Sequence, residues 1–199
     1  MKLKNLETRR SIRSYTDAKL TQEQIENILN SAQFAPTTMG TQAFKLLVIK
    51  RGDVPADTFK SMVWGQAHPS EADMNVIVFT LKSDEVDKNW LSEKLSYVPE
   101  DQRAARVEMA IGHFKSRYDL SGTAFSVAYG MALEADANGV GSTIYTGFDK
   151  DAIEKYFAGQ MPSNYEAVLG VSFGIKSEKA MVYPKALKPL SDFVVEFKK

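Results

Sequence analysis

The sequence contains no cysteine and only two histidines, His68 and His113. Without cysteine the chain has no disulfide, no thiolate nucleophile and no sulfur-ligated zinc or iron–sulfur centre. Two histidines 45 positions apart, with no HExxH or EF-hand pattern, make a poor metal site, so we expect no metal. They also leave a serine triad without a good base, because His113 falls in a predicted amphipathic helix and His68 in a predicted loop.

The chain also lacks an excess of charge of either sign, since its 25 basic side chains balance 25 acidic ones. A general nucleic-acid or anionic-membrane surface is therefore not expected, and any basic site must be local. No apolar run reaches the roughly 18 to 20 residues of a membrane span, and residues 1–7 do not resemble a secretory signal. These absences predict a cytoplasmic protein with one domain over residues 1–199.

Nucleotide-binding motifs are missing as well. Nothing matches a P-loop, and Gly139, Gly141 and Gly147 do not have the spacing of a dinucleotide-binding fingerprint. The carboxylate pairs Asp84–Glu85 and Glu100–Asp101 are typical of helix starts, where the helix dipole favours negative charge.

Alternating helical and strand-like segments predict an α+β or α/β fold. Thr21 begins a capping box with Gln24, and the helix that follows ends before Pro36. The run 74–81 is apolar on both faces and predicts a central strand. The other expected elements are strands at 44–49, 142–145 and 165–174, a helix ending near Trp64–Gly65 with a loop through Pro69, helices at 85–97, 101–118, 121–138 and 150–158, and a strand-like run at 193–197.

The most informative segment is Thr8-Arg9-Arg10-Ser11-Ile12-Arg13-Ser14-Tyr15. Guanidinium groups this close repel one another unless an anion lies between them, and their planar donors match phosphate oxygens. The same residues are also compatible with a solvated basic patch that pairs with surface carboxylates. The segment alone does not name a ligand.

Four further segments follow in order, and together they resemble the FMN-dependent nitroreductase family over almost the whole chain. After the arginine segment comes Pro36-Thr37-Thr38-Met39-Gly40-Thr41-Gln42-Ala43-Phe44, and then Gly65-Gln66 before the central strand. Gly139-Val140-Gly141-Ser142-Thr143-Ile144-Tyr145-Thr146-Gly147-Phe148-Asp149 and Lys185-Ala186-Leu187-Lys188-Pro189-Leu190 complete the series.

The chain departs from the family pattern at several positions. Gly40 stands where the family often has Asn, and Ala43–Phe44 replace Pro–Trp. Leu187 occupies the usual Arg position, which leaves Lys185, with Lys188 beside it, as the tail's cations.

The resemblance implies an α+β three-layer fold with a central mixed sheet flanked by helices, in an intertwined homodimer with FMN at the subunit interface. It implies Arg9, Arg10, Ser11 and Lys185 near the phosphate, and Arg13 near the N1–O2 edge of the ring. A peptide N–H near Thr146–Gly147 would meet N5, and Gln66 the pyrimidine edge. The full set of cofactor-binding candidates is Arg9, Arg10, Ser11, Arg13, Gln66, Tyr145, Thr146, Gly147, Lys185 and Lys188, with Thr37, Thr38, Met39 and Gly40 from the other subunit.

The implied activity is ping-pong transfer of hydride from NADH or NADPH, through FMN, to a nitroaromatic, quinone or other electron-poor acceptor. FMN carries the chemistry, so no side chain is expected to act as a nucleophile. Alternatives are a relative that reduces free flavin or dihydropteridine or removes halide, and a protein that binds or stores FMN with little turnover. Phe44, Trp64 and Phe125 are candidates to line the acceptor pocket, although core packing is favoured for each. The small residues of 121–138 and the apolar 193–197 tail are expected at the dimer contact.

Overall fold

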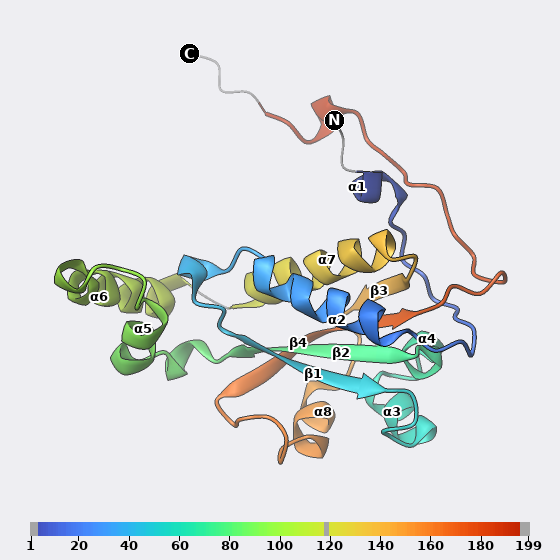
Figure 1. The fold of residues 1–199 in the computed structure, drawn as a ribbon, viewed down its shortest axis with the longest axis horizontal. Helices are drawn as coiled ribbons and strands as arrows, with labels where there is room; N and C mark the ends of the chain where they lie inside the picture. The colour runs from blue at the N-terminus through green and yellow to red at the C-terminus, as the bar shows by residue number, and fades with distance from the viewer. Residues whose placement is uncertain (1–3, 118–119, 196–199) are drawn as a thin grey trace.

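The computed structural model describes residues 4–117 and 120–195 (Figure 1). Its helices are α1 (Lys4–Thr8), α2 (Gln22–Ser31), α3 (Ala56–Met62), α4 (Ala67–Glu71), α5 (Lys88–Lys94), α6 (Glu100–Arg117), α7 (Ser121–Ala137) and α8 (Lys150–Tyr156). Its strands are β1 (Phe44–Lys50), β2 (Met74–Leu81), β3 (Gly141–Tyr145) and β4 (Tyr165–Gly174). Short 3₁₀ turns lie at η1 (Ala32–Phe34), η2 (Thr38–Gly40), η3 (Ser83–Glu85) and η4 (Leu190–Asp192).

The strands form one sheet in the order β1-β2-β4-β3, with antiparallel pairing in each ladder. All eight residues of β2 are buried, as its unbroken apolar run predicts for a central strand. The family resemblance implies a mixed sheet. Among the described residues the parallel pairing is one isolated bridge, between Ser11 and Ser142. The α+β class is confirmed.

The predicted capping box at the start of α2 is present. The Gln24 backbone N–H donates to Thr21 Oγ1 at 3.1 Å, and the Thr21 N–H donates to Gln24 Oε1 at 2.9 Å. Two N–H groups that the first helical turn leaves without intrahelical partners are thereby satisfied by side chains.

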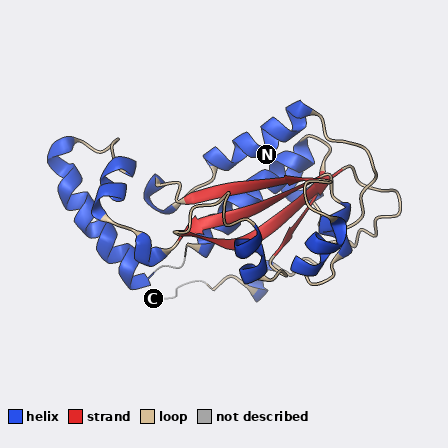
Figure 2. Cartoon of the chain, turned by 90° about the horizontal axis from the view of Figure 1, so that it is seen from below, coloured by secondary structure: helices blue, strands red, loops and turns tan. Residues whose placement is uncertain are grey.

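Helices cover both faces of the sheet and make three layers, which confirms the expected architecture (Figures 1 and 2). α2 and α7 pack on one face, while α3 and α8 pack on the other. The small residues Ala124, Ala128, Ala132 and Ala135 of α7 are fully or almost fully buried against this chain's own core. They allow close packing within the chain, and the exposed side chains of α7 include Phe125 and Tyr129.

One stretch of β4 explains how aromatic side chains reach the α3 and α8 face. Alternate residues of a strand face opposite sides of the sheet, so Val171 and Phe173 enter the α2 and α7 core. Gly170, Ser172 and Gly174 therefore face the other way. A Cβ on Gly170 would lie 2.2 Å from the Tyr145 ring, and one on Gly174 would lie 2.8 Å from the Tyr15 ring. The two glycines leave room for these rings to lie against the strand.

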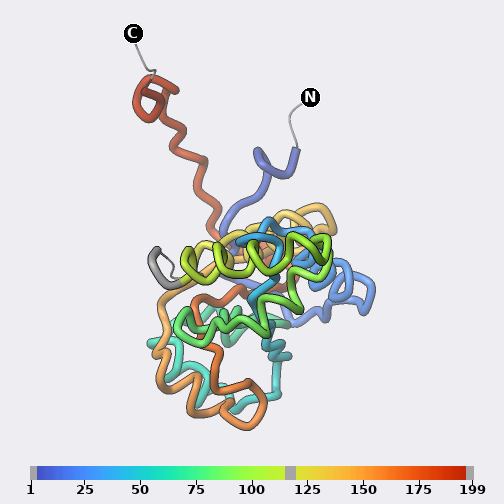
Figure 3. The backbone as a smooth tube through the Cα atoms, turned by 90° about the vertical axis from the view of Figure 1, so that its left-hand side faces the viewer, coloured from blue at the N-terminus to red at the C-terminus, as the bar shows by residue number. Residues whose placement is uncertain are grey.

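Two sequence predictions of secondary structure are wrong. The expected loop through Pro69 contains the short helix α4, where Pro69 falls in the first turn and so removes no intrahelical hydrogen bond. The expected strand at 193–197 is not one: Phe193–Val195 form no ladder, and residues 196–197 lie outside the described residues. The tail and α1 extend away from the body of the molecule (Figures 1 and 3).

No helix in residues 4–117 and 120–195 is long and apolar enough to cross a membrane.

Gly170→Ala should destabilise the protein by about 1–3 kcal/mol, because the new methyl group overlaps the buried Tyr145 ring. Gly112→Ala is the matched control, since a Cβ on this exposed residue of α6 meets nothing within 4 Å. The control should raise stability by up to about 1 kcal/mol through helix propensity. Urea unfolding of both variants measures the difference, and equal effects would refute the packing of Tyr145 on Gly170.

Candidate functional site

The arginine segment runs in extended conformation along the edge of β3. The Ile12 N–H donates to the Ser142 carbonyl at 2.9 Å, and the buried Ile12 side chain lies against Gly141. Side chains alternate along an extended chain, so Ser11 and Arg13 face away from Ile12. A buried isoleucine therefore fixes which way the neighbouring polar groups point.

The structure separates the three arginines by what they bind. The Arg10 guanidinium donates to the carbonyls of Glu7, Thr8 and Arg9 at 2.6–3.1 Å, where α1 ends. The end of a helix leaves such carbonyls without intrahelical donors, and the Arg10 guanidinium supplies donors to them. Arg10 is therefore bound within its own segment. In the part of the chain that the structure describes, the side chains of Arg9 and Arg13 form no hydrogen bond or ion pair. Their donors remain available for an anion.

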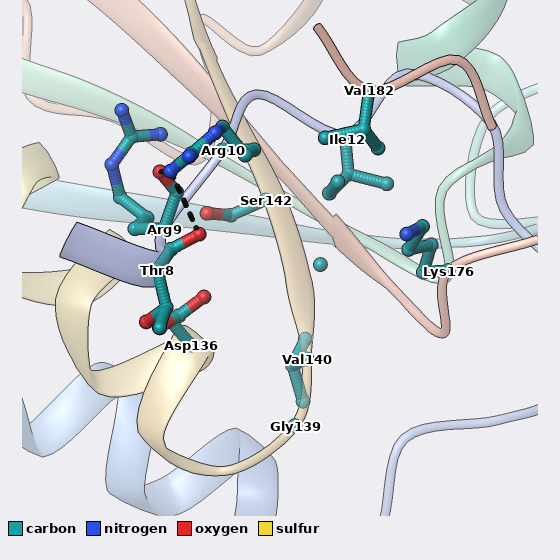
Figure 4. A pocket seen from close by; sticks show the side chains of 11 residues that line it. Thr8, Arg9, Arg10, Ile12, Asp136, Gly139, Val140, Ser142, Lys176 and Val182 are labelled. Carbon is teal, nitrogen blue, oxygen red and sulfur yellow. Dashed lines mark hydrogen bonds between the residues drawn. The ribbon is translucent and has the colours of Figure 1, made fainter. Parts of the chain in front are cut away.

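Arg9 and Arg10 line a cavity of about 250 Å³ (Figure 4). Lys176 lies across this cavity from the arginines, and Asp136 at its edge accepts a hydrogen bond from the Thr8 hydroxyl at 2.5 Å. The sequence motifs did not include Lys176. It follows β4 directly, and its backbone bridges to Tyr15.

The tail lysines differ in their surroundings. Lys185 Nζ donates to the Leu6 carbonyl, which places it beside α1 and close to the arginine segment. Lys188 is exposed, and its side chain has no hydrogen bond or ion pair among residues 4–117 and 120–195. One of the two predicted tail cations is therefore near the arginines within this chain.

His68, which the sequence predicts to lie in a loop, lies in α4 and is buried on the Ser172 side of β4. Its exposed fraction is 6%, and its ring packs edge-on against Tyr145 at 5.5 Å between centroids. His68 Nδ1 lies 3.3 Å from Ser172 Oγ, and Nε2 lies 3.1 Å from Gln66 Oε1. Tyr15, His68 and Tyr145 together make a layer of rings over Gly174, Ser172 and Gly170, called here the ring layer.

Burial shifts the pKa of each group in the ring layer. Loss of solvation, and then the nearby positive charge of Arg13, lower the pKa of His68 from 6.5 to about 4. Desolvation raises the pKa of Tyr15 to about 12 and raises that of Tyr145 as well. At neutral pH the three rings are therefore uncharged, and Arg13 lies close enough to act on His68 and Tyr15.

Gln66 joins the ring layer to the predicted Thr146–Gly147 turn. Its Nε2 donates to the Val63 carbonyl at 3.0 Å and to the Gly147 carbonyl. A Cβ on Gly147 would lie 2.8 Å from Gln66 Nε2, so a larger residue here would displace the end of the Gln66 side chain. All polar atoms of the Gln66 side chain have partners within the chain.

The turn itself presents backbone rather than side chains. Tyr145 is buried, and its hydroxyl donates to Asn75 Oδ1 at 3.3 Å, so its side chain points into the fold. Thr146 is exposed and Gly147 half-buried. The Gly147 N–H has no acceptor among the residues that the structure describes. It is therefore free to donate to a bound molecule.

The segment Thr37–Gly40 lies elsewhere. It forms η2, where Met39 and Gly40 have left-handed backbone, and the Tyr97 hydroxyl donates to the Met39 carbonyl at 2.8 Å. It precedes Phe44, which pairs with Thr80, whereas the arginine segment lies at the Met74 end of the sheet. Six residues of strand separate the two ends by roughly 20 Å, so one chain does not bring these predicted groups together.

The three candidate aromatics also separate. Phe44 is half-buried against the α2 and α7 core. Trp64 is 68% exposed and Phe125 48% exposed, so the expectation that both pack in the core is wrong. Trp64 has a left-handed backbone at φ 53°, and its ring lies beside Gly147.

The Nitroreductase family model matches residues 6–175, which is most of the chain. The chain belongs to the nitroreductase family. YdgI of Bacillus subtilis, whose name describes an NAD(P)H nitroreductase, is 25% identical over 96% of this chain and 94% of its own length.

Solved structures have the same fold. A nitroreductase-like protein of Streptococcus mutans superposes with a TM-score of 0.84 at 23% identity, covering 98% of this chain and 97% of its own. A protein of Exiguobacterium sibiricum solved in complex with FMN has a TM-score of 0.77 at 24% identity, covering 98% and 96%. The resemblance inferred from the ordered motifs is confirmed.

The lowered pKa of His68 predicts a pH dependence of stability. The folded protein resists protonation until about pH 4, whereas the unfolded chain takes up the proton near pH 6.5. Stability from this residue is therefore fully present above pH 6.5 and falls as the pH drops towards 4, by on the order of 1–2 kcal/mol between pH 6.5 and 5.

His68→Gln, which does not titrate, should lack this loss. Urea unfolding of both proteins at steps from pH 7.5 to 5 separates the contribution of His68 from that of the carboxylates, which both share. If the free energy of unfolding falls equally with pH in both proteins, His68 is not held neutral.

Proposed function

We propose that this chain is an FMN-dependent oxidoreductase that takes hydride from NADH or NADPH and reduces an electron-poor acceptor of the nitroaromatic or quinone type. The observation that carries the proposal is a set of unused donors. The Arg9 and Arg13 guanidinium groups and the Gly147 N–H have no partners among the described residues. In a member of the nitroreductase family, these are groups that suit a phosphate and a hydrogen-bond-accepting ring.

The donor set fits FMN in charge. The chain is neutral overall, yet Arg9 and Lys176 line one cavity, and Lys185 lies beside α1, next to the arginine segment. Guanidinium and ammonium groups attract a phosphate dianion, and the Ser11 hydroxyl adds a neutral donor. We assign Arg9, Ser11 and Lys185 to the phosphate, with Arg10 fixing the end of α1 beside them.

Arg13 suits the ring rather than the phosphate. Its positive charge helps to lower the pKa of His68 and opposes the rise in the pKa of Tyr15, so it acts on the ring layer from within electrostatic range. A fixed cation at this place stabilises negative charge that develops on a bound ring during reduction. The Gly147 N–H would supply a neutral donor to the same ring.

When bound, FMN supplies the redox chemistry, accepting a hydride from the nicotinamide and returning the two electrons to the acceptor in a separate half-reaction. The protein itself would bind FMN, orient its ring and polarise it through fixed charges and hydrogen-bond donors. The exposed Trp64 ring beside Gly147 is placed to contact a donor or acceptor at the open face.

The site would be completed by a second copy of the chain. A length of strand of about 20 Å separates Thr37–Gly40 from the arginine segment. The two segments would therefore contact the same cofactor only if Thr37–Gly40 came from a partner subunit. Leu187, Leu190 and Val195 of the extended tail are 70–96% exposed, as expected of an apolar arm that packs on another subunit. The homodimer is therefore part of the proposal.

Anaerobic addition of NADH, and separately of NADPH, to FMN-loaded protein should bleach its absorbance near 450 nm, and a nitroaromatic or quinone should restore it. A protein that stays colourless with FMN would refute cofactor binding. Persistent yellow colour with both donors would indicate a protein that stores FMN without turnover.

Arg9→Ala should weaken FMN binding by about 1.5–3 kcal/mol, the value of a charged hydrogen bond. Arg13→Ala should keep most of the affinity and slow reduction of the bound flavin by NAD(P)H. Lys155→Ala is the control, because Lys155 is an exposed residue of α8 whose side chain has no hydrogen bond or ion pair among the described residues. Fluorescence titration and stopped-flow reduction measure the two quantities. Normal reduction in Arg13→Ala with lost affinity would place Arg13 at the phosphate instead.

A further inference from the structure

We propose that His68 is a positioning residue of this site: as a neutral imidazole held between Ser172 and Gln66, it fixes the turn that presents the Gly147 N–H. This inference rests on the proposed function for its consequence in catalysis. The link itself is a property of the chain and is carried by the contacts of four side-chain and backbone groups.

The contacts of Gln66 define which atom donates in its hydrogen bond with His68. Gln66 uses Nε2 to donate to the Val63 and Gly147 carbonyls, so its Oε1 can only accept. His68 Nε2, 3.1 Å from Oε1, must therefore carry the proton. In a neutral ring Nδ1 is then an acceptor, and it lies 3.3 Å from the Ser172 hydroxyl, whose single proton also faces the Tyr15 hydroxyl at 3.0 Å and the Thr143 carbonyl at 3.5 Å. The chain of donors runs from His68 through Gln66 to the Gly147 carbonyl.

The turn at the end of this chain has few other restraints. The Phe148 N–H donates to the Thr146 carbonyl at 3.1 Å, and the Asp149 N–H donates to the Met62 carbonyl at 2.7 Å. Between them, the Gly147 carbonyl is held by Gln66. That carbonyl shares its peptide plane with the Phe148 N–H, and the Thr146 carbonyl that accepts from Phe148 shares its plane with the Gly147 N–H. Gln66 therefore restricts the direction of the Gly147 N–H through the hydrogen bond from Phe148 to Thr146.

The surroundings of His68 keep its imidazole neutral, as the donor and acceptor roles of its two nitrogens require. Tyr145 from β3 packs against the ring, Tyr15 from the arginine segment reaches Ser172 Oγ at 3.0 Å, and both phenols are protonated. The charged groups nearby are Arg13, which opposes protonation of His68, and Glu71 on α4, whose charge acts on Tyr15. Ser172 is fully buried, so its hydroxyl is shielded from bulk solvent.

The test observes Gly147 directly. Thr146–Gly147 is the one Thr–Gly pair in the sequence, so ¹³C-carbonyl threonine and ¹⁵N-glycine labelling gives a single amide cross-peak for this peptide. His68→Leu fills the site without a donor, whereas His68→Gln restores an N–H where Nε2 lies. We expect His68→Leu to displace the cross-peak of the flavin-free protein, and His68→Gln to return it close to its original position.

Gln66→Met removes the last step of the chain at a half-buried position and should displace the cross-peak in the same direction, even if His68→Leu does not fold. Unchanged positions in Gln66→Met, or equal displacement by His68→Leu and His68→Gln, would overturn the proposal. These spectra need no flavin, so a failure to bind FMN would refute the proposed function and leave this result standing.

In FMN-loaded protein the midpoint potential gives a second readout. It should shift in His68→Leu and lie near the wild-type value in His68→Gln, because only the former loses the fixed Gly147 N–H. Equal potentials in all three proteins would separate His68 from the cofactor.

Discussion

The structure depends on the absence of side chains at two places on one face of β4. Gly170 and Gly174, two residues either side of Ser172, let Tyr145 and Tyr15 lie against the strand with His68 between them. Through these rings the strand holds segments that are distant in the sequence: the arginine segment through Tyr15, α4 through His68, and the 145–149 turn through Tyr145. The same strand contributes Val171 and Phe173 to the opposite core, so one alternating sequence organises both layers.

Charge is organised on this framework. A chain with no net charge keeps the side chains of Arg9 and Arg13 free of ion pairs within the described residues, while Arg10, between them in sequence, binds the end of α1. The buried Ile12 sets this arrangement by fixing the direction of the extended segment. The ring layer beneath is uncharged at neutral pH, so the electrostatic character of the site comes from its arginines and from backbone donors rather than from an acid–base side chain.

Local patterns were sufficient for much of the fold. The apolar run 74–81 and the segment 165–174 gave the two central strands, and the Thr21–Gln24 capping box gave the start of α2, because each depends on neighbours in sequence. The order of weak motifs also identified the family. The burial of His68 could not be read this way, since it depends on the register that brings Ser172 under α4. A glycine–serine–glycine alternation at 170–174 was the signal available, and its meaning depends on which rings pack there. The tail and Trp64 are exposed in the single chain, where apolar composition alone predicted a strand and a core residue.

We propose that the free Gly147 N–H donates to bound FMN, and the hydrogen exchange of this amide tests the proposal directly. In the flavin-free protein this amide has no acceptor among the described residues, so the Thr146–Gly147 cross-peak should exchange rapidly with solvent deuterium. Saturation with FMN should slow the exchange at least about tenfold, as expected for a hydrogen bond worth about 1.4 kcal/mol or more. Exchange that stays as fast when FMN is bound would show that the Gly147 N–H makes no hydrogen bond to the cofactor.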